Sequence, residues 1–156
     1  MESHVELVHR WIEEHSDEVV NLLTDLIRVP SVTPYFNEEK MYMREGDAQR
    51  VLQKYLTQMG MKTEFSYPDP IGLAKYKGKA GYYPNYTFED RPNLYGVYKG
   101  DGDGRSLLLS GHIDVVARGV GWTVDPFGGC RKDGRVYGRG AVDMKGGIAC
   151  MTVAFK

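Results

Sequence analysis

The sequence predicts an α/β protein, in which helices and strands contribute to one fold. Residues 5–26 and 48–59 repeat apolar side chains at the helical period of three to four residues. Three other segments have strand character: residues 63–67 alternate in polarity, and residues 94–99 and 105–110 lie on either side of a glycine-rich turn. The length of 156 residues fits a single domain.

The first helix has clear start and stop signals. Ser3 and Glu6 have the spacing of a capping box, and Pro30 ends the helix because proline restricts its predecessor and lacks an N–H. His15 and Ser16 interrupt the apolar stripe, so the pattern allows either a bend here or two shorter helices. The stripe itself comprises Val5, Val8, Ile12, Val19, Leu23 and Leu26.

The remaining elements follow in order. Gly60 stands where the cap of the second helix is expected, and residues 68–92 are rich in Pro, Gly and Tyr without a period. This segment is interpreted as an irregular loop packed on the sheet by its tyrosines, or as an excursion beside a functional site. The GDGDG turn at 100–104 predicts a hairpin, as does Asp133-Gly134, and a last helix is expected over residues 145–155.

Two stretches carry the candidate chemistry. LLLSGHIDVV, residues 107–116, has the pattern of a buried strand that ends in His112 and Asp114, and GRGAVDMKGG, residues 138–147, places Asp143 in a glycine-rich turn. Imidazole and carboxylate groups are good zinc ligands. Considered alone, His112 is more simply a core or loop histidine and Asp143 a helix N-cap. Lys145 either neutralises charge beside Asp143 or is a solvated lysine at a helix start.

Several motifs, taken together in their order along the chain, indicate a protein family. GHIDVV, WTVDPF at 122–127 and DGRVYGRGAVDMKGG at 133–147 resemble the di-zinc amidohydrolase family that includes acetylornithine deacetylase, succinyl-diaminopimelate desuccinylase, aminoacylase and glutamate carboxypeptidase. Weaker similarity occurs in LLTDLIRVPSVTP at 22–34 and RPNLYGVYKG at 91–100.

The resemblance implies roles for three residues. His112 corresponds to a histidine that binds one zinc, and Asp143 to the carboxylate that bridges both metals. Asp114 corresponds to the acid that orients the imidazole and is counted with the catalytic residues. The peptide bond after Asp143 is expected to be cis. The implied cofactor is zinc, two ions in the complete site, with cobalt as an alternative metal.

The resemblance also implies a fold and a boundary. Helices are expected on a mixed, mainly parallel central sheet, as in zinc aminopeptidases, truncated after the first half of the catalytic domain. Residues 1–156 would be the N-terminal portion of that domain, without the lid domain or the C-terminal half. The family's Glu-Glu pair, its further acid ligand and its C-terminal histidine are not matched here, so the isolated chain is expected to be inactive. The complete protein is expected to be a homodimer.

The expected reaction of the complete protein is metal-dependent hydrolysis of an amide bond in an N-acyl amino acid, in the acetylornithine deacetylase and succinyl-diaminopimelate desuccinylase branch. Two alternatives stay open: a dipeptidase or carboxypeptidase of the same family, with short-peptide substrates, and a truncated, non-catalytic binding module. A net charge of −1 does not indicate the excess of positive charge that is typical of proteins binding nucleic acid or an anionic membrane. Cys130 and Cys150 show no disulfide framework, which favours the cytoplasm.

Overall fold

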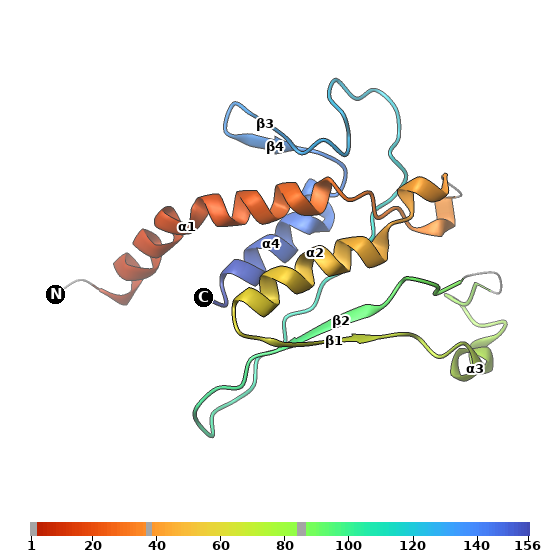
Figure 1. Ribbon diagram of the computed structural model, residues 1–156, viewed down its shortest axis with the longest axis horizontal. Coiled ribbons are helices and arrows are strands. Elements are labelled where there is room, and N and C mark those ends of the chain that lie inside the picture. Colours follow the sequence, from red (N-terminus) through yellow and green to blue (C-terminus); the bar gives the residue numbers. More distant parts are fainter. Residues whose placement is uncertain (1–2, 37–38, 84–86) are drawn as a thin grey trace.

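The computed structural model describes residues 3–36, 39–83 and 87–156. Helices α1 (His4–Ile27), α2 (Glu45–Gln58) and α4 (Gly146–Val153) pack together in the middle of the molecule (Figure 1). The ribbon of β1 (Lys62–Ser66) and β2 (Asn93–Val97) lies on one side of them, and the short hairpin of β3 (Cys130–Lys132) and β4 (Arg135–Tyr137) on the other. Short segments complete the element order: α3 (Pro70–Leu73), the 3-10 turns Pro34–Phe36, Lys40–Tyr42 and Ala74–Tyr76, and the turn Ala141–Lys145.

Helix α1 is one continuous helix, so the alternative of two shorter helices that meet at His15 is wrong. The capping box is confirmed: Ser3 N–H donates to the Glu6 carboxylate at 2.7 Å, and the Ser3 hydroxyl accepts from Glu6 N–H at 3.3 Å. His15 fits within the helix because its ring stacks on Trp11. The side chains at the C-terminal end of the helix are buried, whereas Val5 and Val8 are more than half exposed.

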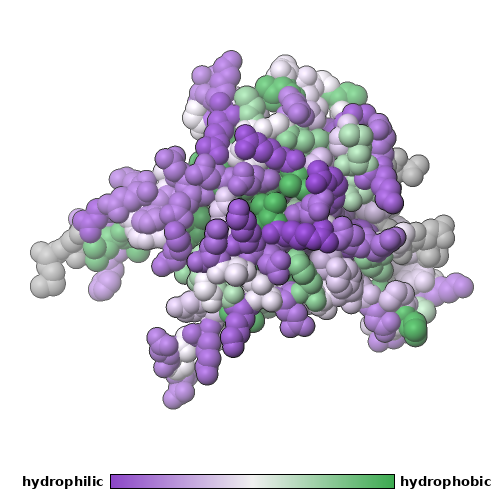
Figure 2. Space-filling model, in the orientation of Figure 1, coloured by the Kyte–Doolittle hydropathy of each residue, from purple (hydrophilic) through white to green (hydrophobic). Residues whose placement is uncertain are grey.

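The core lies where the three long helices meet. Its buried side chains come from α1, α2, α4 and the segment just before Asp114, and they are Leu22, Leu26, Ala48, Ile113, Ile148 and Ala149. A second cluster joins Val32, Val115 and Phe127. Figure 2 shows hydrophilic side chains over most of the face formed by α1 and α2, with apolar side chains visible between the two helices. The predicted second helix and last helix are therefore confirmed, and Gly60 ends α2 with a positive φ of 81°.

The strand prediction is only partly confirmed. The strand at 63–67 is present as β1, which pairs antiparallel with β2, and the Asp133-Gly134 hairpin is present as β3 and β4. The GDGDG hairpin is wrong, because β2 pairs with the earlier strand β1 and residues 105–110 form no strand.

The expected buried strand in 107–116 is also wrong. Leu107 and Leu108 are 75% and 86% exposed, and only Val115 makes a β-bridge, parallel to Val32. A strand is stabilised by hydrogen bonds to neighbouring strands on either side. The described residues place no strand ladder against 105–112, and this apolar run stays irregular. The mainly parallel central sheet is therefore not formed by the described part of the chain, whose two sheets are two-stranded and antiparallel.

The described parts of the tyrosine-rich segment, residues 68–83 and 87–92, lie at one end of the β1–β2 ribbon (Figure 1). The segment contains α3 and a 3-10 turn, and the Tyr83 ring contacts Tyr35, with ring centroids 5.3 Å apart. Tyr76 and Tyr83 are 44% and 51% exposed, and the packing of this segment on the sheet by its tyrosines stays a prediction. Residues 84–86 lie outside the described part. Among the described helices, none has the length and apolar character needed to cross a membrane.

Candidate metal centre

Asp143 lies in a tight turn that leads into α4. Gly140 opens the turn with a φ of 83°, and Asp143 and Met144 depart from helical backbone angles. The peptide bond between these two residues is cis, which confirms the prediction. The Asp143 side chain is 85% exposed, so its carboxylate faces solvent rather than the core.

His112 is placed by the residues that follow it. Val115 N–H donates to the Ser31 carbonyl at 2.9 Å, and Thr33 N–H donates to the Val115 carbonyl at 3.0 Å. The Ser31 hydroxyl donates to the Ile113 carbonyl at 2.7 Å and is fully buried. These bonds attach the His112-x-Asp114 segment to the chain that leaves α1.

The structure brings all three predicted site residues together. His112 Nε2 lies 3.0 Å from Asp143 Oδ1, although 31 residues separate them in sequence. His112 Nδ1 lies 3.0 Å from the Asp114 carbonyl oxygen and 3.3 Å from Asp114 Oδ1. When Nδ1 carries the proton, its N–H donates a hydrogen bond to Asp114. Nε2 then presents a lone pair in the direction of Asp143.

The electrostatics of His112 follow from these contacts. Partial burial of the ring lowers its pKa, but hydrogen bonds to the Asp114 carbonyl and the Asp143 carboxylate favour the protonated form. The bonds and the two nearby negative charges outweigh burial, and the pKa of His112 is raised above 6.5. These contacts favour a positive charge on the His112 ring.

The donor set of the site fits part of a zinc centre. An imidazole nitrogen and a carboxylate oxygen each bind zinc at about 2.0–2.2 Å, which places two donors on one tetrahedral ion roughly 3.4 Å apart. The observed 3.0 Å between His112 Nε2 and Asp143 Oδ1 needs only a small opening. No group of three or more His, Cys, Asp or Glu side chains that could hold a metal occurs in residues 3–36, 39–83 and 87–156.

Lys145 is a residue whose role the sequence did not reveal. Its side chain is completely buried, and its ammonium group donates to the carbonyls of Leu26 at 2.8 Å and Val29 at 2.9 Å. Burial lowers the pKa of Lys145 to about 7. The interpretation as a solvated lysine is therefore wrong. No local pattern marks this role, because the partner carbonyls lie 119 and 116 residues earlier in the chain.

A largely buried ion pair beside the site was also not predicted. Arg91 Nε and Nη2 donate to the two carboxylate oxygens of Glu45 at 2.7 and 2.9 Å. Burial raises the pKa of the Glu45 carboxyl, Arg91 opposes this, and the negative charge of Asp114 adds to it. Glu45 therefore feels the charge of one site residue, Asp114.

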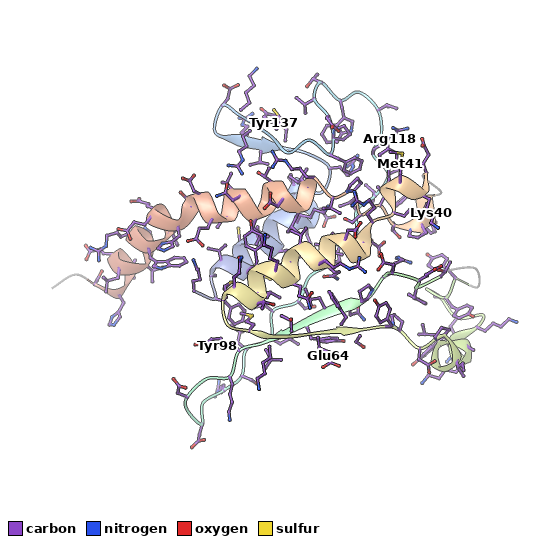
Figure 3. The ribbon with its side chains drawn as sticks, in the orientation of Figure 1. Lys40, Met41, Glu64, Tyr98, Arg118 and Tyr137 are labelled. Carbon is purple, nitrogen blue, oxygen red and sulfur yellow. The ribbon has the colours of Figure 1, made fainter. Side chains whose placement is uncertain are left out.

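The loop that follows the His112 segment is stabilised by an arginine that contacts an aromatic ring and by ring–ring packing. The Arg118 guanidinium lies 5.0 Å from the centre of the Tyr42 ring and donates to the Tyr42 hydroxyl at 3.0 Å. Figure 3 shows Arg118 beside Met41 and Lys40. Trp122 Nε1 donates to the Arg118 carbonyl at 2.6 Å, and Phe127 packs on Tyr42. The WTVDPF motif therefore supports the loop and supplies no group to the His112–Asp143 pair.

Comparison with known proteins gives a consistent result. The model of peptidase family M20/M25/M40 matches residues 108–156, which contain all three site residues. A succinyl-diaminopimelate desuccinylase of Methylobacterium radiotolerans is 39% identical over 139 residues, covering 88% of this chain and 29% of the relative. The protein named succinyl-diaminopimelate desuccinylase 2 of a Ruegeria species is 34% identical over 143 residues, covering 90% of this chain and 29% of the relative.

A third relative, a succinyl-diaminopimelate desuccinylase of Novosphingobium aromaticivorans, is 44% identical over 86 residues, covering 55% of this chain and 22% of its own length. This chain thus spans less than a third of the length of the curated relatives that it matches. The matched segment includes the turn that carries Asp143 and the segment that carries His112. The chain belongs to peptidase family M20/M25/M40.

Proposed function

We propose that the whole protein is a zinc-dependent hydrolase of the amide bond in N-acyl amino acids, with N-succinyl amino acids as its first substrate class. The observation that carries the proposal is the 3.0 Å approach of His112 Nε2 to Asp143 Oδ1, with Nδ1 held by Asp114. The names of the three relatives support the succinyl group, and acetylornithine remains an alternative substrate within the same class.

Each residue of the site has a defined task in this proposal. His112 would bind the metal through Nε2, and Asp143 through its exposed carboxylate. Asp114 keeps the proton on Nδ1 and holds the plane of the ring, which leaves Nε2 free to bind. Zinc, when bound, supplies a hydroxide at neutral pH and stabilises the negative charge that develops on the amide oxygen.

The 156 residues alone are proposed to be inactive. A catalytic zinc site uses three protein ligands and keeps one position for water or substrate, and His112 and Asp143 supply two. A general base that takes the proton of the attacking water is a further requirement. The whole protein is therefore the sample to assay, with the 156-residue chain beside it.

The test is an assay of amine release from succinyl-diaminopimelate, N-acetylornithine and a dipeptide by the zinc-loaded whole protein. We expect the succinyl compound to be the best substrate and His112→Ala to lose nearly all activity, whereas His9→Ala, at an exposed position on α1, keeps it. Preference for the dipeptide would replace the proposal by the peptidase alternative. Absence of both zinc binding and hydrolysis would favour the binding module.

A further inference from the structure

The turn that carries Asp143 is attached to the end of α1 by a buried lysine. Lys145 follows Asp143 by two residues, and its ammonium group donates to the Leu26 and Val29 carbonyls. The same lysine closes the turn through its backbone, because its N–H donates to the Gly140 carbonyl at 2.9 Å. The side chain and backbone of Lys145 therefore connect the turn to α1.

The segment that carries His112 is attached to the same place. Ser31 accepts from Val115 N–H and donates through its hydroxyl to the Ile113 carbonyl, on the two sides of Asp114. Ser31 lies two residues after Val29, which accepts from Lys145. We call residues 26–33 the α1 anchor, because both ligand-bearing segments hydrogen-bond to it.

Few further contacts hold the two ligands. His112 lies in an irregular segment outside any strand, and Asp143 lies in a non-helical turn. The His112 N–H donates to Met144 Sδ at 3.4 Å, a weak contact that joins the two segments directly, and both ligand side chains are substantially exposed. The separation of the two side chains therefore depends largely on where their backbones are attached.

We propose that Lys145 and Ser31 are positioning residues, which set the separation of His112 Nε2 and Asp143 Oδ1 through the α1 anchor and thereby the metal affinity of the site. The inference rests on the proposed function. Binding sites work when their donors are held within about 0.5 Å of the required geometry by surrounding hydrogen bonds and packing. Lys145 and Ser31 supply that support from buried positions.

The competing explanation is that Lys145 is buried only because it caps the C-terminal end of α1. The last carbonyls of a helix lack partners within the helix, and a basic side chain can satisfy them. A cap would contribute to stability without a specific effect on the metal. Thr24 provides the matched control, because it is buried in α1 outside the anchor, and its hydroxyl donates to the Val20 carbonyl and accepts from Arg131 Nε.

The experiment compares Lys145→Met, Ser31→Ala and Thr24→Val in the whole protein. Zinc affinity is measured by competition with a chromogenic chelator, the visible absorption of the Co²⁺ form reports ligand geometry, and the thermal midpoint reports stability. We expect Lys145→Met and Ser31→Ala to weaken zinc binding by about 10- to 100-fold and to change the Co²⁺ spectrum. Thr24→Val should lower the thermal midpoint and leave zinc affinity within about twofold of the wild type.

The outcomes separate this inference from the proposed function. Wild-type zinc affinity in Lys145→Met and Ser31→Ala would overturn the inference and leave the proposed function intact. Equal loss of zinc affinity in Thr24→Val would also overturn it, because the effect would then follow stability alone. A wild-type protein that binds no zinc would overturn the proposed function itself. If Lys145→Met does not fold, Ser31→Ala, which removes only one hydroxyl, decides the question.

Discussion

Arg91 donates to both carboxylate oxygens of Glu45, and this pair joins the end of the tyrosine-rich segment to the first turn of α2. Both side chains are largely buried. Arg91 also donates to the Thr87 carbonyl at 2.9 Å, which extends the connection along the segment. Arg91, which lies in a motif of weak similarity, thus connects the tyrosine-rich segment to α2.

Removing one partner of this pair should destabilise the protein strongly. In Arg91→Met, the Glu45 carboxylate stays buried without its two donors, and the expected loss is about 3–5 kcal/mol in the free energy of unfolding. Urea unfolding followed by circular dichroism measures it. The double variant Glu45→Leu with Arg91→Met should recover much of the loss, because an apolar pair leaves no buried charge. A change below about 1 kcal/mol in the single variant would contradict the prediction.

Glu45 should also make stability depend on pH. Its folded-state pKa is raised above 4.5 by burial, so the native state holds the proton more tightly than the unfolded chain does. The resulting contribution to stability is fully present below pH 4.5 and is lost as pH rises through the raised pKa. The stability difference between wild type and Glu45→Gln should therefore fall from pH 4.5 to pH 7. A stability difference between wild type and Glu45→Gln that stays constant between these two pH values would refute the prediction.

The turn before Asp143 should not tolerate a side chain at its first residue. Gly140 and Gly134 both have positive φ, but a Cβ at Gly140 would overlap Val115 Cγ1 and approach Lys145 Cδ at 3.3 Å, whereas a Cβ at Gly134 meets nothing within 4 Å. Gly134→Ala should cost about 1 kcal/mol for the backbone alone. Gly140→Ala should cost a further 1–3 kcal/mol for overpacking. Equal melting temperatures for the two variants would rule this out.

Asp114 should control metal binding through the imidazole. In Asp114→Ala, His112 Nδ1 loses the carboxylate at 3.3 Å and keeps the backbone carbonyl at 3.0 Å. Zinc affinity of the whole protein should fall by about 10- to 100-fold, because the orientation of the ligand ring is less restricted. Isothermal titration of zinc measures this, with the exposed Asp103→Ala as the control. Unchanged affinity in Asp114→Ala would mean that the backbone carbonyl alone orients the ring.

The exposed apolar run before His112 should cause association of the 156-residue chain. Leu107 and Leu108 lie mostly in solvent, and Leu108 lines a cavity of about 280 Å³ between β2 and α4. Exposed apolar patches favour association. Sedimentation velocity should show a shift toward monomer in the double variant Leu107→Ser with Leu108→Ser. Its free energy of unfolding should change by less than about 0.5 kcal/mol per site, since little buried surface is lost. A wild-type chain that is already monomeric would contradict the prediction.

Local signals in the sequence were sufficient for the elements that depend on nearby residues. The capping box of α1, the glycine that ends α2 and the Asp133-Gly134 hairpin each involve residues within a few positions of one another, and all three are present. The motif resemblance also placed His112, Asp114 and Asp143 in one site, which the structure brings together.

The strand predicted for residues 107–116 shows the limit of prediction from local sequence patterns. An apolar run predicts burial, but burial of a strand depends on neighbouring strands that the run does not specify. The burial of Lys145 and the pairing of Glu45 with Arg91 likewise join residues 119 and 46 positions apart. The helices, the tight turns and the identity of the candidate ligands could be predicted from the sequence. The groups that hold those ligands in place could not, because these carbonyls and carboxylates become neighbours of the site only when distant segments pack together.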